Sequence, residues 1–170
     1  MRPVEATHLV LVGMMGVGKS TVGRMVAERL QRPLFDSDEM IEARTGHTVR
    51  EIFEADGEPA FRKLETEVLI EALRRPEPSV IAAAGGVVLR PENREALRAP
   101  DVRVVWLSAT PDLLVERVRS GGHRPLLDQD PEATLRKMYT DREPLYREVA
   151  DAIVHVDRRS IGEVADAVLR

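Results

Sequence analysis

The chain contains no cysteine, which excludes disulfide bonds, thiol chemistry and cysteine-ligated metal sites. It also lacks any apolar run long enough to cross a membrane, and its first residues lack the apolar core of a signal peptide. From these two absences we expect a cytoplasmic protein that makes no contact with a membrane. The histidines show no metal-ligand spacing, because they are scattered along the chain at His8, His47, His123 and His155.

An excess of positive charge is missing as well. The 170 residues include 25 Lys and Arg against 29 Asp and Glu, which gives a net charge of −4. Nucleic-acid-binding domains usually carry a strong basic field, so we expect no nucleic acid as a partner. No linker, repeat or low-complexity segment divides the sequence, and its length suits one domain with a substantial core. We therefore expect a single domain over residues 1–170, with basic residues acting at local sites.

Residues 13–20 match the phosphate-binding loop pattern G-x-x-x-x-G-K-[ST], because they read G-M-M-G-V-G-K-S. Glycines let successive backbone N–H groups turn toward phosphate oxygens, and the following helix points its positive dipole end at the same place. Lys19 would reach the β- and γ-phosphates, and the Ser20 hydroxyl would hold Mg²⁺. An ordinary glycine-rich turn is the alternative. The apolar run at 8–12 and the helical spacing over 21–30 favour a phosphate site, since such a loop joins a strand to a helix.

Short apolar runs alternate with helical patterns along the whole chain. We expect strands at residues 8–12, 33–36, 80–84, 102–107 and 152–156. Strands that alternate with helices over short connections predict a parallel sheet covered by helices on both faces, which is an α/β fold with three layers. Ligands in such folds gather at the carboxyl ends of the strands. The residues that follow each strand should therefore indicate the site.

Several residues mark where helices should begin or end. The spacings Thr48-x-x-Glu51 and Ser160-x-x-Glu163 are typical of capping boxes. Pro144 should kink or end the helix in which it lies. Prolines that suit the first turn of a helix are Pro59, Pro91, Pro111 and Pro131. Glycines that suit the end of a helix are Gly46, Gly57 and Gly121.

Two aspartates, Asp36 and Asp38, come at the end of the second expected strand. Beside a phosphate loop, one carboxylate can hold Mg²⁺ through water, and another can orient an alcohol and accept its proton. Capping of the next helix is the simpler interpretation for Asp38, because aspartate is common at helix starts. Gly85 and Gly86 follow the third expected strand, where they either form a turn or let a substrate approach the backbone closely.

Arginines recur in the segments between the expected strands. Arg62 follows an apolar residue in a helical stretch, and from the residues alone a solvated helix face is the favoured interpretation. Arg124 lies in a glycine-rich, basic and then apolar loop, so it is either a phosphate ligand on a closing lid or a surface charge. Arg142 lies where a helix should kink or end. Arg158 and Arg159 open the last segment, in a solvated turn or next to a nucleotide.

Six motifs run in order along most of the chain. They read G-M-M-G-V-G-K-S-T-V-G at 13–23, F-D-S-D at 35–38, I-F-E-A-D-G-E-x-A-F-R-K-L-E at 52–65, A-G-G-V-V at 84–88, R-P-L-L at 124–127 and R-E-P-L-Y at 142–146. No motif after the first is specific by itself. The ordered set is specific, because gluconate kinases and nucleoside monophosphate kinases share the phosphate loop without the rest. Together the motifs resemble the shikimate kinase family.

The resemblance implies a P-loop kinase fold with five parallel strands in the order 2-3-1-4-5. It also implies small insertions, one for substrate binding at about residues 38–65 and one that forms a lid at about residues 120–129. The implied reaction is the ATP-dependent phosphorylation of the 3-hydroxyl of shikimate to shikimate 3-phosphate, a step toward chorismate and the aromatic amino acids. The partners of this monomeric enzyme would be ATP and shikimate, and its cofactor would be Mg²⁺.

The resemblance assigns residues to the nucleotide and the metal. Ser20 would ligate Mg²⁺, and Asp36 would support the ion through water. Arg124 would contact the phosphates from the lid. Arg159 would lie near adenine, with Arg158 as the alternative, because the tail of the chain looks shorter than in some family members. The ATP phosphates would be held by Gly16, Val17, Gly18, Lys19, Ser20 and Thr21.

On the acceptor side, Asp38 would bind the shikimate hydroxyls and is the family's candidate base, whether it removes the proton or only positions the hydroxyl. Arg62 and Arg142 would grip the shikimate carboxylate, for which a pair of planar guanidinium groups is well suited. The bound carboxylate would lie beside the Gly85 backbone. Phe53 and Phe61 would shape the pocket, Glu65 would orient its polar groups, and Gly86 would be a further substrate contact. The catalytic residues would be Lys19, Asp38 and Arg124.

Other functions fit the sequence less well. A related kinase for gluconate or a nucleoside monophosphate would not need the arginines and the two aspartates. A GTPase switch needs an N-K-x-D signature, whereas the single asparagine, Asn93, is followed by Arg94. A catalytically inactive binding module would be expected to have lost Lys19, Asp38 or Arg124, and all three are present. The chain departs from the family where a triple glycine is replaced by A-G-G at 84–86, which keeps the second and third positions.

Overall fold

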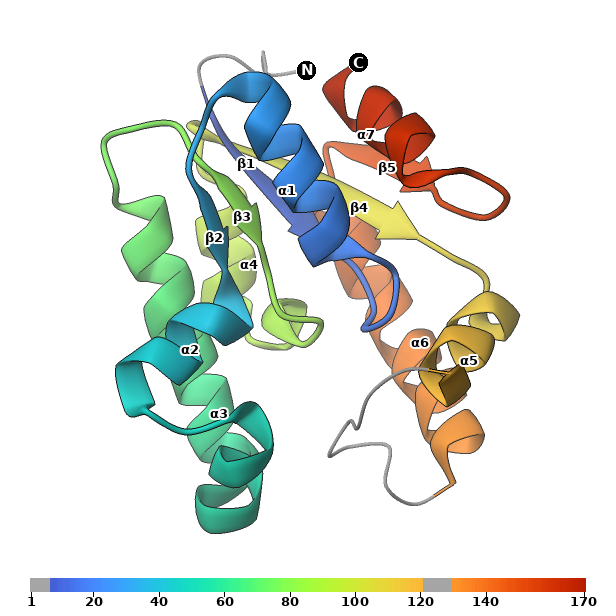
Figure 1. Ribbon diagram of the computed structural model, residues 1–170. Helices are drawn as coiled ribbons and strands as arrows, with labels where there is room; N and C mark the ends of the chain where they lie inside the picture. The colour runs from blue at the N-terminus through green and yellow to red at the C-terminus, as the bar shows by residue number, and fades with distance from the viewer. Residues whose placement is uncertain (1–6, 121–129) are drawn as a thin grey trace.

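A five-stranded sheet forms the centre of the computed structural model, which describes residues 7–120 and 130–170. All strand pairs are parallel, in the order β2-β3-β1-β4-β5 (Figure 1). This order confirms the predicted one, and each strand begins and ends within two residues of its expected bounds. The strands are β1 (His8–Val12), β2 (Leu34–Asp36), β3 (Val80–Ala82), β4 (Val102–Ser108) and β5 (Ala152–His155).

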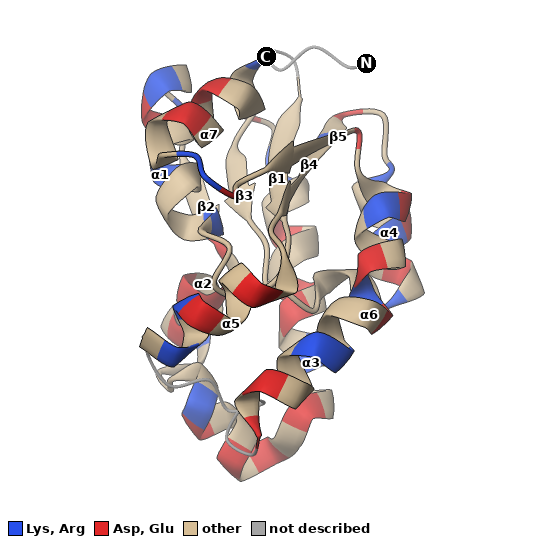
Figure 2. Ribbon diagram, turned by 90° about the vertical axis from the view of Figure 1, so that its right-hand side faces the viewer, with Lys and Arg blue, Asp and Glu red and all other residues tan. Residues whose placement is uncertain are grey.

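Helices cover both faces of the sheet, as the alternating pattern predicts. Figure 2 shows the sheet between α1 and α7 on one side and α4 and α6 on the other. None of the helices in the described part of the chain is both long and apolar enough to span a membrane. The helices are α1 (Lys19–Leu30), α2 (Ser37–Thr45), α3 (Val49–Leu73), α4 (Pro91–Leu97), α5 (Pro111–Ser120), α6 (Pro131–Val149) and α7 (Ile161–Leu169), with a short 3₁₀ helix, η2 (Val87–Leu89), after β3.

The main core lies between the sheet and the two helix layers. Every residue of β1 and of β4 is buried, which explains why these strands read as continuous runs of mostly apolar residues rather than as alternating ones. β3 is shorter than expected, because after Ala82 the chain leaves the sheet to make the turn that leads into η2. The Ala83 N–H still donates to the carbonyl of Leu11 at 3.1 Å, so the chain departs only after one further bond to β1.

Most of the predicted helix boundaries are confirmed. Ser160 and Glu163 form a complete capping box at the start of α7. At the start of α3 the structure shows one half of the predicted box: the Thr48 hydroxyl accepts from the backbone N–H of Glu51, and the Glu51 carboxylate pairs with His47. Gly46 ends α2 in the left-handed conformation, with φ at 73°. Gly121 lies outside the described residues.

The expected end of the helix at Pro144 is wrong, because α6 runs through the proline to Val149. A proline inside a helix removes one backbone hydrogen bond. The helix is nonetheless held by a buried face that includes Leu135, Arg142 and Tyr146. Packing of this face against η2 and β4 outweighs the lost bond.

A kink at Gly57 divides α3 into two helical segments. Gly57 has φ 83° and ψ 176°, a conformation that only glycine adopts readily, and Pro59 stands in the first turn of the second segment. A small second core made of Ile41, Ile52, Phe61 and Val68 joins both segments of α3 to α2. The kink and this core together place the second segment so that charged side chains on it become buried.

Candidate active site

Two adjoining cavities lie at the carboxyl ends of the strands. One, of about 300 Å³, is lined by arginine, acidic and phenylalanine side chains and is here called the arginine cavity. The other, of about 250 Å³, is lined largely by the loop between β1 and α1 and is called the loop cavity. The residues that line both cavities, and so mark where they meet, are Met15, Asp38, Ala84 and Gly85.

The loop of the loop cavity has the conformation that its glycines predict. Gly13 has φ 149°, and a Cβ atom there would lie 2.5 Å from the carbonyl oxygen of Leu107, so no other residue fits without a shift. The Lys19 ammonium donates hydrogen bonds to the carbonyls of Gly13 at 2.7 Å and Met14 at 3.0 Å. Lys19 is therefore folded back on its own loop, at the N-terminus of α1.

Asp36 joins the phosphate loop to the end of β2. One of its carboxylate oxygens accepts from the Ser20 hydroxyl, and the other accepts from the backbone N–H of Glu39 at 3.1 Å, where it caps α2. The aspartate that caps this helix is therefore Asp36 and not Asp38. Asp36 is buried, so its carboxylate is held in place next to the Ser20 oxygen.

The oxygen pair of Ser20 and Asp36 fits a hard cation such as Mg²⁺, which prefers oxygen ligands and keeps several waters. Among residues 7–120 and 130–170, no group of three or more His, Cys, Asp and Glu residues is arranged to hold a metal ion. The donor set thus suits an ion that takes its remaining ligands from water and phosphate oxygens, and it does not form a cage made by protein alone.

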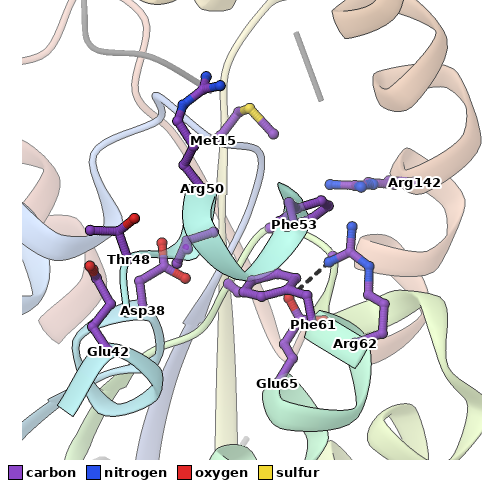
Figure 3. A pocket seen from close by; sticks show the side chains of 14 residues that line it. Met15, Asp38, Glu42, Thr48, Arg50, Phe53, Phe61, Arg62, Glu65 and Arg142 are labelled. Atoms are coloured by element: carbon purple, nitrogen blue, oxygen red, sulfur yellow. Dashed lines mark hydrogen bonds and ion pairs between the residues drawn. The ribbon is translucent and has the colours of Figure 1, made fainter. Parts of the chain in front are cut away.

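Asp38 lies in the first turn of α2, where the two cavities meet. Figure 3 shows Asp38 on one side of the arginine cavity and Arg62 and Arg142 on the other, with Phe53 and Phe61 between them. The two phenylalanine rings lie 4.8 Å apart between centroids and form an apolar wall. The arginine cavity therefore has a cationic end and an acidic end that faces the loop cavity.

Arg62 is buried, which contradicts the solvated helix face that its neighbours in the sequence favour. Its Nε and Nη2 atoms donate to one oxygen of Glu58 at 3.1 and 3.0 Å, and Nη1 donates to Glu65 at 2.9 Å. Arg142, on α6, is only 4% exposed. Two buried guanidinium groups from different helices are thus brought to the same cavity.

The turn after β3 makes room for these two guanidinium groups. A Cβ atom on Gly86 would lie 2.0 Å from Nη1 of Arg62, and one on Gly85 would lie 3.4 Å from Nη1 of Arg142. Gly86 is therefore needed for Arg62 itself to approach the backbone, whereas a Cβ atom on Gly85 would be in ordinary van der Waals contact with Arg142. The sequence predicts glycines here for the approach of a substrate, and the structure adds this second reason.

Glu65 is a second buried carboxylate of the site, with 1% of the residue exposed. Burial raises the pKa of Glu65 above its ordinary value, and the positive charges of Arg62 and Arg142 offset part of that rise. The carboxylate holds Arg62 from below, on the same helix, as Figure 3 shows by the dashed line between the two side chains. Glu65 thus acts on Arg62 directly, as its predicted orienting role requires.

Sequence reasoning missed several residues of the site. Arg117, on α5, donates to the loop carbonyls of Gly16 at 3.2 Å and Val17 at 3.1 Å. Tyr146 donates to the Gly85 carbonyl. Two signals could have found it: it ends the R-E-P-L-Y motif, and it lies one helical turn after Arg142. Further residues that line the arginine cavity or hold its arginines are Glu42, Thr48, Arg50 and Glu58.

Two predicted site residues are not brought to the cavities by the described part of the chain. Arg159 is exposed in the connection between β5 and α7, and it lines neither cavity. Arg158, the alternative, is exposed in the same connection and has φ 62°. Arg124 and the expected lid, apart from Ser120, lie outside the described residues.

Comparison with known proteins gives the same picture from sequence and from structure. The family model described as shikimate kinase matches residues 15–170. A shikimate kinase of Burkholderia lata is 47% identical over 163 residues, which cover 95% of this chain and 88% of that protein. One from Symbiobacterium thermophilum is 46% identical over 165 residues, covering 95% and 94%. The solved shikimate kinase of Acinetobacter baumannii in complex with shikimate is 40% identical, with a TM-score of 0.91 over 98% of this chain and 95% of that one.

Proposed function

The chain belongs to the shikimate kinase family. We propose which role each residue of the two cavities has in the family's reaction. The reaction is the transfer of a phosphoryl group from ATP to the 3-hydroxyl of shikimate, which gives shikimate 3-phosphate for the synthesis of chorismate and the aromatic amino acids. We assign shikimate to the arginine cavity and the ATP phosphates to the loop cavity. The observation that carries this assignment is the position of Asp38, which lines both.

We propose that the carboxylate of shikimate binds Arg62 and Arg142. A guanidinium group has five N–H donors, and the three hydrogen bonds that Arg62 makes to Glu58 and Glu65 leave two. Two parallel donors match a carboxylate in a bidentate pair. With its carboxylate at this end, the ring of shikimate would lie against Phe53 and Phe61, and its hydroxyls would reach Asp38 at the other end.

Asp38 would then receive the 3-hydroxyl at the boundary of the two cavities. Its carboxylate can accept a hydrogen bond from the hydroxyl and turn the oxygen toward the γ-phosphate. In a loose transition state little proton transfer is needed early, so either alignment alone or alignment with proton removal would satisfy the reaction. Both roles require the negative charge of Asp38.

The loop cavity would hold the phosphates through the backbone N–H groups of residues 16–21. Lys19 would exchange the carbonyls of Gly13 and Met14 for phosphate oxygens when ATP binds. Mg²⁺ bound by the Ser20 hydroxyl and, through water, by Asp36 would neutralise negative charge on the β- and γ-phosphates. Ser20 and Asp36 are already in contact, which supports this assignment.

Three assignments rest on the family resemblance alone. We propose that Arg124 contacts the transferring phosphate, that residues 120–129 act as a lid, and that Arg159 lies near adenine. We also propose that the protein acts as a monomer. The cytoplasm, which supplies ATP, is the compartment we propose for the reaction.

A coupled assay of ADP release tests the assignment of the acceptor. Wild-type protein should release ADP with Mg²⁺, ATP and shikimate, and only at a background rate with gluconate, with AMP or without an acceptor. Asp38→Asn serves as the matched inactive control. Equal turnover with gluconate or AMP would contradict the assignment of the arginine cavity to shikimate.

A further inference from the structure

Tyr146 is a buried tyrosine to which the proposed mechanism gives no role. It lies on α6, one turn after Arg142, and is 1% exposed. Its ring stacks on Trp106 of β4, with centroids 5.7 Å apart and an interplanar angle of 26°. Stacking on a residue of the central sheet fixes the ring, and therefore also fixes where its hydroxyl points.

The Tyr146 hydroxyl joins two parts of the proposed acceptor site. It donates a hydrogen bond to the carbonyl of Gly85, and the positive charge of Arg142, one turn earlier on α6, acts on the same hydroxyl. Burial raises the pKa of Tyr146 to about 12, so the phenol keeps its proton at physiological pH and can go on donating to Gly85.

The bond to Gly85 matters because two consecutive glycines, Gly85 and Gly86, form the turn at this point. A peptide unit is planar, so fixing the Gly85 carbonyl also fixes the N–H of Gly86, which points in the opposite direction. Glycines have wide conformational freedom, and without an external bond this peptide plane could rotate. The rotation would also disturb the space into which Arg62 fits, since its Nη1 lies against Gly86.

We infer that Tyr146 is a positioning residue for the acceptor: its hydroxyl group fixes the Gly85–Gly86 peptide, next to the guanidinium groups of Arg62 and Arg142, before shikimate arrives. The inference rests on the proposed function, because it needs the shikimate carboxylate to bind at this end of the arginine cavity. Tyr146 acts through the Gly85–Gly86 peptide and does not itself touch the reacting atoms.

Tyr146→Phe tests the inference, because it removes the hydroxyl and keeps the ring on Trp106. The shikimate carboxylate is held alike in the ground and transition states, so its loss of positioning should appear in KM. We expect KM for shikimate to rise about tenfold, with kcat within about threefold and KM for ATP unchanged. Tyr139→Phe is the matched control, because Tyr139 lies on the same helix and lines neither cavity.

The pattern of constants separates positioning from a merely structural role. A loss of stability alone would lower the amount of active enzyme and would leave both KM values unchanged. An unchanged KM for shikimate in Tyr146→Phe, or equal rises in both KM values, would overturn the inference. Wild-type protein that fails to phosphorylate shikimate would instead overturn the proposed function, so the two failures are distinguishable.

A spectroscopic measurement on wild-type protein keeps the test valid even if Tyr146→Phe does not fold. The chain has two tyrosines, so ring labelling with ¹³C at Cζ gives two signals, and Tyr139→Phe identifies them. We expect shikimate to shift the Tyr146 signal and ADP alone to leave it unchanged. The reason is that the shikimate carboxylate would bind Arg142, whose charge acts on the Tyr146 hydroxyl. A Tyr146 signal that does not shift at a saturating concentration of shikimate would contradict the positioning role.

Discussion

The loop cavity and the arginine cavity meet at Asp38, yet they are built by different means. The loop cavity is lined by three short stretches of chain, and the largest of them runs from Met15 to Thr21 and contains glycines with positive φ. The arginine cavity is lined by side chains from α2, α3, the turn after β3 and α6. The loop cavity therefore depends most on the local conformation of one loop, and the arginine cavity depends on the packing of helices that are distant in the sequence.

The two cavities also differ in whether their positively charged side chains are already oriented for a ligand. Arg62 is buried and held by Glu58 and Glu65, so its orientation is set before any ligand binds. Lys19 is bonded to the carbonyls of its own loop and must change partners. The comparison indicates that the acceptor end is preorganised, whereas part of the phosphate end is completed by the nucleotide.

The largest effect is expected at the phosphate end, from Lys19→Ala. Lys19 would neutralise charge on the transferring phosphoryl group, a contribution of about 3–4 kcal/mol to the transition state. We expect kcat to fall a few hundredfold with the fold intact, as circular dichroism would show. Lys137→Ala, at an exposed lysine on α6, is the control. More than about a tenth of wild-type kcat in Lys19→Ala would contradict this role.

Asp38→Asn and Asp36→Asn should divide chemistry from metal binding at the boundary of the cavities. Asparagine keeps the size of Asp38 but removes its charge, so we expect kcat to fall about a hundredfold with little change in the Mg²⁺ requirement. Asp36→Asn should instead raise the Mg²⁺ concentration needed for half-maximal activity. Titrating Mg²⁺ against activity in both variants checks this, and rescue of Asp38→Asn by excess Mg²⁺ would reverse the assignment.

A smaller effect is expected at the acceptor end, from Arg142→Ala and likewise from Arg62→Ala. Each change removes a charged hydrogen-bonding partner of the shikimate carboxylate and should lower kcat/KM for shikimate by about 2 kcal/mol, or roughly thirtyfold. Arg→Lys should restore part of the loss, because an ammonium group cannot form the planar fork. ATP affinity measured without shikimate should not change. Equal loss of ATP and shikimate binding would indicate misfolding or a nucleotide role.

Gly86→Ala tests whether the arginine cavity is as tightly preset as its contacts suggest. The new Cβ atom would overlap Nη1 of Arg62, so the guanidinium group must move and KM for shikimate should rise about tenfold. Gly162→Ala on α7, where the nearest atom to the new Cβ is 3.8 Å away, should leave every constant unchanged. A normal KM in Gly86→Ala would mean that Arg62 need not be fixed for shikimate to bind.

The smallest effect concerns the pH dependence of stability through Glu65. Burial raises the pKa of Glu65 in the folded protein above its ordinary value of 4.5. The folded state therefore binds this proton more tightly than the unfolded state, and the stabilisation is lost as pH rises above 4.5. We expect the free energy of unfolding of the wild type, relative to that of Glu65→Gln, to fall by at most about 1.4 kcal/mol for each pH unit of increase.

Denaturant titrations of both proteins across this pH range measure the difference. A relative stability of the wild type that rises with pH would mean that the attraction of Arg62 and Arg142 exceeds the effect of burial. The arginine cavity would then be held by charge pairing to a greater extent than we infer.

Much of the phosphate end could be predicted from residues alone. The strand, the loop and the helix are consecutive in the sequence, and the glycine pattern directly determines the backbone conformation of the loop. Residues 13–20 therefore indicated a phosphate-binding role without any knowledge of packing. The order of the sheet came from the resemblance, while its parallel character followed from the alternation of strands and helices. Pro144 shows the limit of local rules, because a buried helix face outweighed its helix-breaking tendency.

The acceptor end could not be derived in this way. Arg62 reads as a surface residue, and it is buried only because the kink at Gly57 and the packing of α3 turn it inward. Arg62 and Arg142 were assigned to one site by family resemblance. Tyr146 was missed, because its partner Gly85 lies 61 residues away along the chain and no local pattern joins the two.

The central claim is that the two cavities hold the two substrates with the reacting hydroxyl at Asp38. A crystal structure with ADP and shikimate tests it most directly. The account predicts the shikimate carboxylate on Arg62 and Arg142, and the 3-hydroxyl within hydrogen-bonding distance of the Asp38 carboxylate, facing the loop cavity. A carboxylate bound away from both arginines, or a 3-hydroxyl turned away from Asp38, would contradict it.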